Sequence, residues 1–291
     1  MDEITFNSIE KKAEVLIEAL PYITQYRGKT IVIKYGGNAM INEELKNAVI
    51  SDIVLLSCIG INVVLVHGGG PEITDMLKRV GKESRFVNGL RYTDAETAEI
   101  AQMVLAGKIN KDLVSMINCA GGNAIGISGF DGGLIKAKKK SDNGVDYGFV
   151  GEISDVNTKI IRDNLSNGYI VVVSTVAAGE NGEVYNINAD TAALEIAIAL
   201  KADRVLVLTD VRGVLKDAHD ESSLISDIKL SEIPDLIKSG IITGGMIPKI
   251  ESIANAVKLE IKSASIIDGR VKHSIIVELF SHEGFGTIIH R

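Results

Sequence analysis

A lysine and several glycines stand at the ends of predicted strands, where charge and backbone could together bind an anion. Lys34 ends the run TIVIK just before Gly36 and Gly37. The run NVVLVHGGG closes on Gly69 and Gly70. Glycine lets the backbone approach a ligand closely, and N–H groups at a helix start bind anions. Any one of these turns is equally consistent with an ordinary strand-to-helix connection, but together they favour a site for phosphate or carboxylate groups.

A second lysine and a carboxylate could complete that site. Lys249 follows Gly244 and Gly245 by one helical turn, and Asp190 lies in the run NINADTAALEIA. Two lysines beside separate glycine turns could neutralise the oxygens of a phosphoryl group during its transfer, where electrostatic positioning carries most of the catalysis. Asp190 could hold those lysines in place, although a carboxylate at a helix start more often caps the helix. Each lysine alone is more often a solvated surface residue.

The established nucleotide-binding motifs do not fit the sequence. Lys29 precedes a strand and lacks the earlier glycine of a P-loop, and after Gly68 the dinucleotide pattern ends on Ile73 instead of a glycine. His67 could be mistaken for a catalytic base, but at the end of a buried strand we expect it to fix the turn by hydrogen bonding. The sequence therefore predicts phosphate binding without a P-loop or a dinucleotide fold.

The composition excludes several classes of protein. The 291 residues are 46% hydrophobic, and the net charge of −7 disfavours a protein that binds nucleic-acid backbones through a basic face. Cys58 and Cys119 lie in apolar helical patterns without metal-site spacing, so we expect buried thiols in a reducing compartment. The first ten residues lack the pattern of an export signal, and no run is apolar enough to span a membrane. We therefore expect a cytoplasmic protein.

The elements that must position these residues alternate between strands and helices. The β-branched runs TIVIKYGG, NVVLVHGGG and RVLVLTD are separated by amphipathic patterns such as EELKNAVISDIVLLSCIG. This alternation predicts βαβ units and a mostly parallel sheet. Unbroken apolar strands are typical of sheets covered on both faces. We therefore predict an α/β fold, a three-layer αβα sandwich.

Two departures from this pattern indicate how the chain is organised. Residues 94–119 form a long helical pattern that Asp94 can cap, and residues 124–153 change to short β segments with glycine turns, which predicts a hairpin excursion. The glycine-bearing run AAGENGEV is the best candidate for a lobe boundary. We expect two lobes, 28–178 and 179–291, on one continuous sheet.

Residues 1–27 precede the alternating pattern and predict an amphipathic helix, which Pro21 should kink. Its apolar stripe at helical spacing comprises Ile9, Ala13, Leu16, Leu20 and Ile23. Such a helix could cover the core of its own chain, the more common arrangement, or pack against the same helix in another subunit.

Seven motifs, taken in order, carry a resemblance to a known family. They are IKYGGNAM, VHGGGPEI, GLRYTD, GISGFDGG, NINAD, LTDVRGVL and GGMIPK. The set resembles the amino acid kinase family over nearly all of residues 29–291, and most closely its members that phosphorylate N-acetyl-L-glutamate. The resemblance implies a carbamate kinase-like αβα sandwich, with an N-terminal lobe that binds N-acetyl-L-glutamate and dimerises and a C-terminal lobe that binds ATP. It also implies transfer of the γ-phosphoryl group to the γ-carboxylate, giving N-acetyl-L-glutamyl 5-phosphate in the second step of arginine biosynthesis.

The resemblance implies roles for individual residues. Lys34 and Lys249 match the lysines that stabilise the transferring phosphoryl group, and Asp190 matches the aspartate that orients them. Arg91 matches the arginine that pairs with the substrate α-carboxylate, and Asn186 matches another substrate contact. Gly69 and Gly70 match backbone donors of the substrate site, and the phosphate and nucleotide positions are Gly36, Gly37, Thr209, Asp210, Gly244, Gly245 and Met246.

The implied chemistry needs no general base. A carboxylate is already ionised near neutral pH, so bringing two anions together demands charge neutralisation and in-line positioning instead. The planar fork of Arg91 suits bidentate binding of a carboxylate. Mg²⁺ commonly binds through substrate phosphates, so we expect it to arrive with ATP and predict no metal site made by the protein.

Two further segments imply regulation. The helix IEKKAEVLIEALPYITQY and the segment HSIIVELFSHEGFGT resemble elements of family members that arginine inhibits, in which the helix joins dimers into a ring-shaped hexamer, a trimer of dimers. Arginine is therefore an expected inhibitor, with Tyr22, His273, Glu278 and Gly284 as candidate contacts. Some relatives also bind a nitrogen-signalling PII protein, a candidate partner that no residue pattern here decides.

Two alternatives stay open on the sequence. A kinase of the same fold could act on aspartate, glutamate, carbamate or UMP, although GLRYTD and NINAD favour N-acetyl-L-glutamate. A catalytically silent nucleotide sensor could use the same cleft, although Lys34, Asp190 and Lys249 are all intact.

Overall fold

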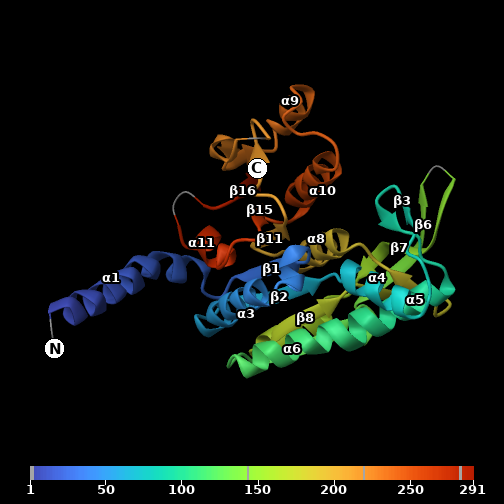
Figure 1. Cartoon of the computed structure of the whole chain (residues 1–291), viewed down its shortest axis with the longest axis horizontal. Coiled ribbons are helices and arrows are strands. Elements are labelled where there is room, and N and C mark those ends of the chain that lie inside the picture. Colours follow the sequence, from blue (N-terminus) through green and yellow to red (C-terminus); the bar gives the residue numbers. More distant parts are fainter. Residues whose placement is uncertain (1–2, 143, 219, 282–283) are drawn as a thin grey trace.

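An eight-stranded sheet runs through the molecule, which a computed structural model describes for residues 3–142, 144–218, 220–281 and 284–291 (Figure 1). From one edge to the other its strands are β14 (Asp227–Lys229), β16 (Thr287–His290), β15 (Ser263–Asp268), β11 (Arg204–Thr209), β1 (Thr30–Tyr35), β2 (Asn62–His67), β8 (Ile170–Ser174) and β5 (Ala124–Ser128). All neighbours from β15 to β5 pair in parallel, and β16 is antiparallel to β15. The predicted mostly parallel sheet is confirmed.

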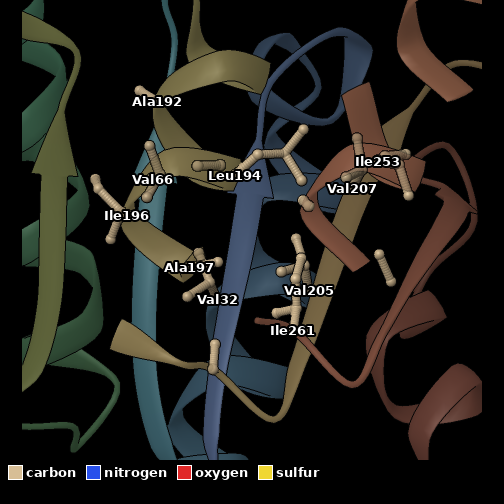
Figure 2. Packing of buried hydrophobic residues seen from close by; sticks show 14 of the residues in the cluster. Val32, Val66, Ala192, Leu194, Ile196, Ala197, Val205, Val207, Ile253 and Ile261 are labelled. Atoms are coloured by element: carbon tan, nitrogen blue, oxygen red, sulfur yellow. The ribbon is translucent and has the colours of Figure 1, made fainter. Parts of the chain in front are cut away.

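Alternate residues of each strand pack into two different apolar layers. Val32 of β1 faces one layer, whereas its neighbours Ile31 and Ile33 face the other, as the alternation of side chains along a strand requires. Figure 2 shows the first layer, where Leu194 and Ile253 pack near the strands. That layer contains α7 (Lys159–Ser166), α8 (Ala189–Leu200) and α10 (Met246–Leu259), and the opposite layer contains α3 (Glu43–Cys58), α4 (Gly70–Arg79), α5 (Ala95–Gln102), α6 (Asn110–Cys119) and α11 (Ser274–Leu279). The predicted three-layer sandwich is confirmed.

The long helical pattern at 94–119 forms as predicted, with one interruption. Asp94 is the N-cap, and its Oδ1 accepts a hydrogen bond from the Thr97 N–H at 2.8 Å. Between α5 and α6 the helix widens into the π-helical segment η1 (Met103–Ile109). Nothing in the apolar periodicity predicts this segment.

A small closed sheet stands apart from the main sheet. It contains β6 (Ile135–Asp142), β7 (Val145–Val156), β9 (Val176–Ala178) and β10 (Val184–Asn186). The predicted hairpin excursion is confirmed for β6 and β7 but is wrong for residues 124–128, which form the edge strand β5 of the main sheet because they pair in parallel with β8. The predicted lobe boundary falls in β9, β10 and their turn, and the division into two lobes stays a prediction.

The remaining short elements connect the larger ones. They are α2 (Asn38–Ile41), β3 (Phe86–Val87), β4 (Leu90–Arg91), η2 (Asp131–Gly133), β12 (Val214–Leu215), η3 (Glu221–Ser223), β13 (Leu224–Ile225) and α9 (Ile233–Lys238). Strands β3 and β4 form a hairpin whose turn residues, Asn88 and Gly89, both have positive φ. Asn-Gly is the dipeptide that such tight turns favour.

The N-terminal helix α1 (Glu3–Tyr26) projects away from the sheet (Figure 1). The apolar side chains Leu16 and Leu20 are 71% and 57% exposed, and only near the helix end is Tyr26 buried. The expectation that this helix covers its own core is therefore wrong for most of its length, because only the C-terminal end of the helix lies against the rest of the chain (Figure 1). Leu16 and Leu20 of the apolar stripe therefore face solvent in the single chain.

Two expectations from composition have different outcomes. Cys58 and Cys119 are exposed, not buried, because each is the last residue of its helix, where solvent reaches the side chain. Among the helices that the structure describes, none has the length and hydropathy needed to cross a membrane.

Candidate active site

Two lysines and one aspartate meet beyond the carboxyl ends of the central strands. The Asp190 carboxylate lies between them, with Oδ1 at 3.0 Å from Lys34 Nζ and Oδ2 at 2.7 Å from Lys249 Nζ. Strand β1 supplies Lys34, the first turn of α8 supplies Asp190, and α10 supplies Lys249. Open α/β sheets bind ligands at this end of their strands. The three residues singled out in the sequence therefore form one cluster.

Asp190 is free for this cluster because another residue caps α8. The N-cap is Asn188, whose Oδ1 accepts a hydrogen bond from the Thr191 N–H at 3.1 Å. Capping by Asp190, the more common role for a carboxylate at a helix start, is therefore not the role it has here.

The two lysines keep the Asp190 carboxylate ionised. Burial alone would raise the pKa of Asp190, but the nearby charges of Lys34 and Lys249 outweigh burial and hold that pKa below its usual value. The carboxylate therefore stays ionised at neutral pH, and the cluster carries one net positive charge. That charge suits an incoming anionic group.

The first glycine turn joins the ends of β1 and β11. Gly37 has φ of 71°, and a Cβ there would lie 2.8 Å from Asp210 Oδ1, so only glycine fits. The same Asp210 oxygen accepts a hydrogen bond from the Asn38 N–H at 3.0 Å. Because β11 pairs in parallel with β1, Thr209 and Asp210 reach this turn from the other half of the chain.

The second glycine turn begins α4, with Gly69 as the N-cap and Gly70 as the first helical residue. The Gly68 N–H donates to the Tyr35 carbonyl oxygen at 3.1 Å, which ties this turn to the end of β1. A Cβ at Gly69 would lie 2.2 Å from Ile109 Cδ1 and 2.7 Å from Leu105 Cδ2, so a larger residue would force these side chains to move. N–H groups at this helix start can bind an anion.

A cavity of about 310 Å³ lies between the two glycine turns and the small sheet. Its lining includes seven of the predicted site residues: Lys34, Gly36, Gly37, Gly69, Gly70, Arg91 and Asn186. Apolar side chains, among them Ile73, Leu105 and Val150, line the same cavity. A mixed wall with convergent polar groups suits a small organic anion.

Arg91 is held rigidly at the edge of this cavity. Its Nη2 donates to the Gly70 carbonyl oxygen at 2.7 Å and to Thr74 Oγ1 at 2.8 Å, and its Nη1 donates to Ser84 Oγ at 2.6 Å. The guanidinium also lies over the Phe86 ring, 4.9 Å from its centroid. Burial lowers the pKa of Arg91 from its ordinary value.

Several residues of this wall were not predicted from the sequence. Thr74 and Ser84 fix Arg91, and Thr93 Oγ1 accepts a hydrogen bond from Asn186 Nδ2 at 3.4 Å. The sequence signals for them are the spacing of Thr74 from Gly70, one helical turn along α4, and the position of Thr93 in the motif GLRYTD.

A second cavity, of about 580 Å³, adjoins the first and shares Gly89, Leu90, Val150 and Asn188 with it. Its lining includes Asp190, Lys249 and Gly245, so the lysine–aspartate cluster lies where the two cavities meet. Gly245 is the N-cap of α10 and Met246 its first residue, and Gly244 precedes them with φ of 53°. Two ligands in adjoining cavities would face each other across the cluster.

His67 is fully buried beside the second glycine turn. Its Nδ1 lies 2.9 Å from the Gly68 carbonyl oxygen, and burial lowers its pKa to about 4. A neutral ring that is hydrogen-bonded to the glycine turn agrees with the prediction that His67 fixes this turn.

A third cavity, of about 620 Å³, is lined by residues of α1 and α11, among them Tyr22 and Glu278 of the predicted regulatory contacts, and by Gly284. Glu278 is 3% exposed and pairs with Arg204 at 2.5 Å. His273 is not among its lining residues, because its Nδ1 bonds Asp52 of α3 at 2.6 Å. Residues 282–283 of the predicted regulatory segment lie outside the described residues.

The donor set around the cluster consists of lysines, an arginine and backbone N–H groups. Within the described ranges, no group of three or more His, Cys, Asp or Glu side chains is placed to hold a metal ion. Lysine, arginine and backbone N–H groups donate to the oxygens of anionic groups.

The sequence of residues 29–268 matches the model of the amino acid kinase family. The chain belongs to the amino acid kinase family. It is also 58% identical over 282 residues to the acetylglutamate kinase of Clostridium beijerinckii, a match that covers 96% of this chain and 98% of that one. Family membership identifies a phosphotransferase and confirms the resemblance in the motifs.

Solved structures share the fold. N-acetylglutamate synthase from Neisseria gonorrhoeae, complexed with coenzyme A and N-acetyl-glutamate, superposes with a TM-score of 0.85 at 25% identity over 96% of this chain, which spans only 63% of that longer protein. Carbamate kinase from Giardia lamblia bound to AMP-PNP superposes with a TM-score of 0.64 at 20% identity, over 91% of this chain and 99% of that one. The predicted carbamate kinase-like architecture is confirmed.

Proposed function

We propose that this chain is an acetylglutamate kinase, which transfers the γ-phosphoryl group of ATP to the γ-carboxylate of N-acetyl-L-glutamate in the second step of arginine biosynthesis. The observation that carries the proposal is the position of Asp190, which holds Lys34 and Lys249 where two cavities meet. The near full-length relatives that are 53–58% identical and bear this name support the choice of acceptor.

The acceptor would occupy the cavity between the glycine turns. Arg91 and Asn186 line that cavity, and a guanidinium held by Thr74 and Ser84 is preorganised for a carboxylate. The acceptor γ-carboxylate would then face Lys34 and the N–H groups that begin α4. Its ionised oxygen attacks the γ-phosphorus, the bond from that phosphorus to the bridging oxygen of ATP breaks, and ADP leaves with those electrons.

The lysines act on the charge that moves during this step. Lys34 lies on the acceptor side and Lys249 on the side of the second cavity, so together they can neutralise the phosphoryl oxygens between the two substrates. Asp190 keeps the two ammonium groups from moving apart. No group needs to remove a proton, which agrees with the neutral, hydrogen-bonded state of His67.

ATP would occupy the cavity that Lys249 and Gly245 line. Four other predicted nucleotide residues would lie at its edge: Gly244 and Met246 flank Gly245 at the start of α10, and Thr209 ends β11, with Asp210 after it at the first glycine turn. Mg²⁺ would be held through the phosphates of ATP and would supply further neutralisation of their charge. The protein groups present fit this arrangement, because they offer cations and N–H donors to the phosphates rather than a cage of carboxylates.

The proposal extends to regulation and assembly in the cytoplasm. Arginine would bind in the cavity that residues of α1 and α11 line, where Tyr22, Glu278 and Gly284 contribute to the wall. The exposed apolar side chains of α1, among them Leu16 and Leu20, would join dimers into a hexamer. A PII protein stays a candidate partner.

A panel of acceptors tests the proposed activity. ADP release from ATP in the presence of Mg²⁺ should require N-acetyl-L-glutamate and should fall to background with glutamate, aspartate, carbamate or UMP. Turnover with one of the other anions would instead support a same-fold kinase of different specificity. ATP binding without ADP release from any acceptor would support a silent nucleotide sensor.

A further inference from the structure

A buried hydrogen-bond network links the start of α6 to the second glycine turn. Asn110, the first residue of α6, is 1% exposed. Its Nδ2 lies 3.0 Å from the Val172 carbonyl oxygen, 3.3 Å from that of Ile127 and 3.3 Å from His67 Nε2. Its Oδ1 accepts a hydrogen bond from Lys111 Nζ at 3.0 Å. A polar network buried among β2, β5 and β8 costs free energy unless its groups are hydrogen-bonded. When they are, the network holds these elements in one specific arrangement.

Lys111 and the carbonyl oxygens of Ile127 and Val172 together determine which way the Asn110 amide points. An ammonium group only donates, so the atom that it contacts must be the amide oxygen, and the amide NH₂ must face His67. His67 Nε2 then accepts a hydrogen bond, and the single proton of the neutral ring lies on Nδ1. That Nδ1–H donates to the Gly68 carbonyl oxygen at 2.9 Å.

The π-helical segment η1 (Met103–Ile109) places these residues against the turn. A Cβ at Gly69 would lie 2.2 Å from Ile109 Cδ1 and 2.7 Å from Leu105 Cδ2, so both side chains press on the turn from η1. Asn110 follows directly after the segment. An α-helix of the same residues would rotate these three side chains relative to one another, and π-helical turns occur frequently at functional sites.

We propose that Asn110 is a positioning residue for the transfer: it holds the His67 ring so that Nδ1–H stays directed at the Gly68 carbonyl oxygen, and thereby fixes that carbonyl and the N–H groups of Gly69 and Gly70. The inference rests on the proposed function and adds to it a residue that touches neither substrate. Preorganised N–H donors need no reorganisation during the reaction, and a displacement of about 1 Å can cost roughly 100-fold in rate. The loss should therefore appear mainly in kcat.

The kinetic test replaces Asn110 by leucine, which has a similar shape and no hydrogen-bonding groups. Asn110→Leu should lower kcat by about 10- to 100-fold and change the KM for ATP by less than about twofold. The matched control is Asn118→Leu in the same helix, because Asn118 Oδ1 accepts a hydrogen bond from the Ala124 N–H at 2.7 Å, away from the glycine turn. Equal kcat values in the two variants would overturn the positioning role.

A spectroscopic test separates this inference from the proposed activity. In protein with ¹⁵N-labelled histidine, His67 should give the signals of the Nδ1–H tautomer, and Asn110→Leu should shift the Nε2 signal because that nitrogen loses its hydrogen bond. Lys111→Met leaves the carbonyl oxygens of Ile127 and Val172 to orient the Asn110 amide, so it should keep the wild-type Nε2 signal. An unchanged Nε2 signal in Asn110→Leu would overturn the network, whether or not the wild type phosphorylates N-acetyl-L-glutamate; a wild type without turnover would overturn the proposed function alone.

Discussion

At the scale of single residues, the most informative contact is that of Asp190 with Lys34 and Lys249. Distant parts of the chain supply these two lysines. Lys34 and Lys249 could be identified from the sequence because each stands beside a glycine turn at the end of a predicted element. The contact itself could not be predicted from spacing alone, since Asp190 is also a plausible helix cap. What decided between these roles is Asn188, which caps α8 instead.

Neutralising Asp190 should impair catalysis much more than folding. Asp190→Asn removes the charge that holds Lys34 and Lys249 together, so kcat should fall by about 10²- to 10³-fold with a smaller change in the KM for ATP. Steady-state kinetics with both substrates measures the effect.

The chain offers a matched control for that variant. Asp203 is a partly buried carboxylate that bonds Lys262 Nζ at 2.7 Å and the Thr30 N–H at 3.0 Å, at the opposite end of β1. Asp203→Asn should reduce thermal stability and leave kcat within about twofold. Similar kcat losses in both variants would contradict a specific role for Asp190.

His67 should make the stability of the protein depend on pH. Burial lowers its pKa to about 4, whereas the unfolded chain should protonate it near 6.5, so the unfolded state binds more protons as pH falls between these values. The free energy of unfolding should therefore fall by roughly 2 kcal/mol between about pH 7.5 and pH 5 through this group alone. Urea denaturation at each pH, compared with His67→Gln, isolates the contribution; parallel pH profiles for the two proteins would refute it.

At the scale of elements, the strands and most helices could be predicted and the exceptions have physical reasons. Apolar runs and amphipathic periods indicated β1, β2, β11, α3, α8 and α10, because both faces of a parallel sheet are covered. The π-helical turns of η1 could not be predicted, since they depend on how Leu105 and Ile109 pack against Gly69. The exposure of Cys58 and Cys119 depends on where two helices end, which periodicity determines only within a few residues.

Helix α1 should be dispensable for catalysis and required for regulation. Deleting residues 1–24 removes the exposed Leu16 and Leu20 together with Tyr22 of the third cavity. The shortened chain should be an active dimer that arginine inhibits poorly, whereas the full chain should form a larger assembly. Light scattering and arginine titration of the activity measure the two effects.

A less drastic change serves as the control for that deletion. Leu16→Glu with Leu20→Glu keeps the helix and the third cavity but places charges on the apolar stripe. It should prevent the larger assembly as the deletion does. Undiminished arginine inhibition of the deleted chain, or a larger assembly in either variant, would contradict the role given to α1.

At the scale of the whole molecule, one parallel sheet positions the two cavities and the lysine–aspartate cluster between them. The carboxyl ends of β1, β2 and β11 bring the two glycine turns and Asp210 together, although these residues are far apart along the chain. The fold could be predicted from ordered motifs, and so could the residues of the lysine–aspartate cluster, whose role in phosphoryl transfer stays a prediction. Thr74, Ser84 and Asn110, which hold Arg91 and His67, could not, because their contacts depend on three-dimensional packing that one sequence does not reveal.

The most direct test of the central claim is to trap the product with hydroxylamine, which converts acyl phosphates to hydroxamates. With ATP, Mg²⁺ and N-acetyl-L-glutamate, the wild type should form a hydroxamate in step with ADP, and Asp190→Asn should form both at least about 100-fold more slowly. ADP release without hydroxamate, or wild-type rates in Asp190→Asn, would contradict phosphoryl transfer to the γ-carboxylate by the lysine–aspartate cluster.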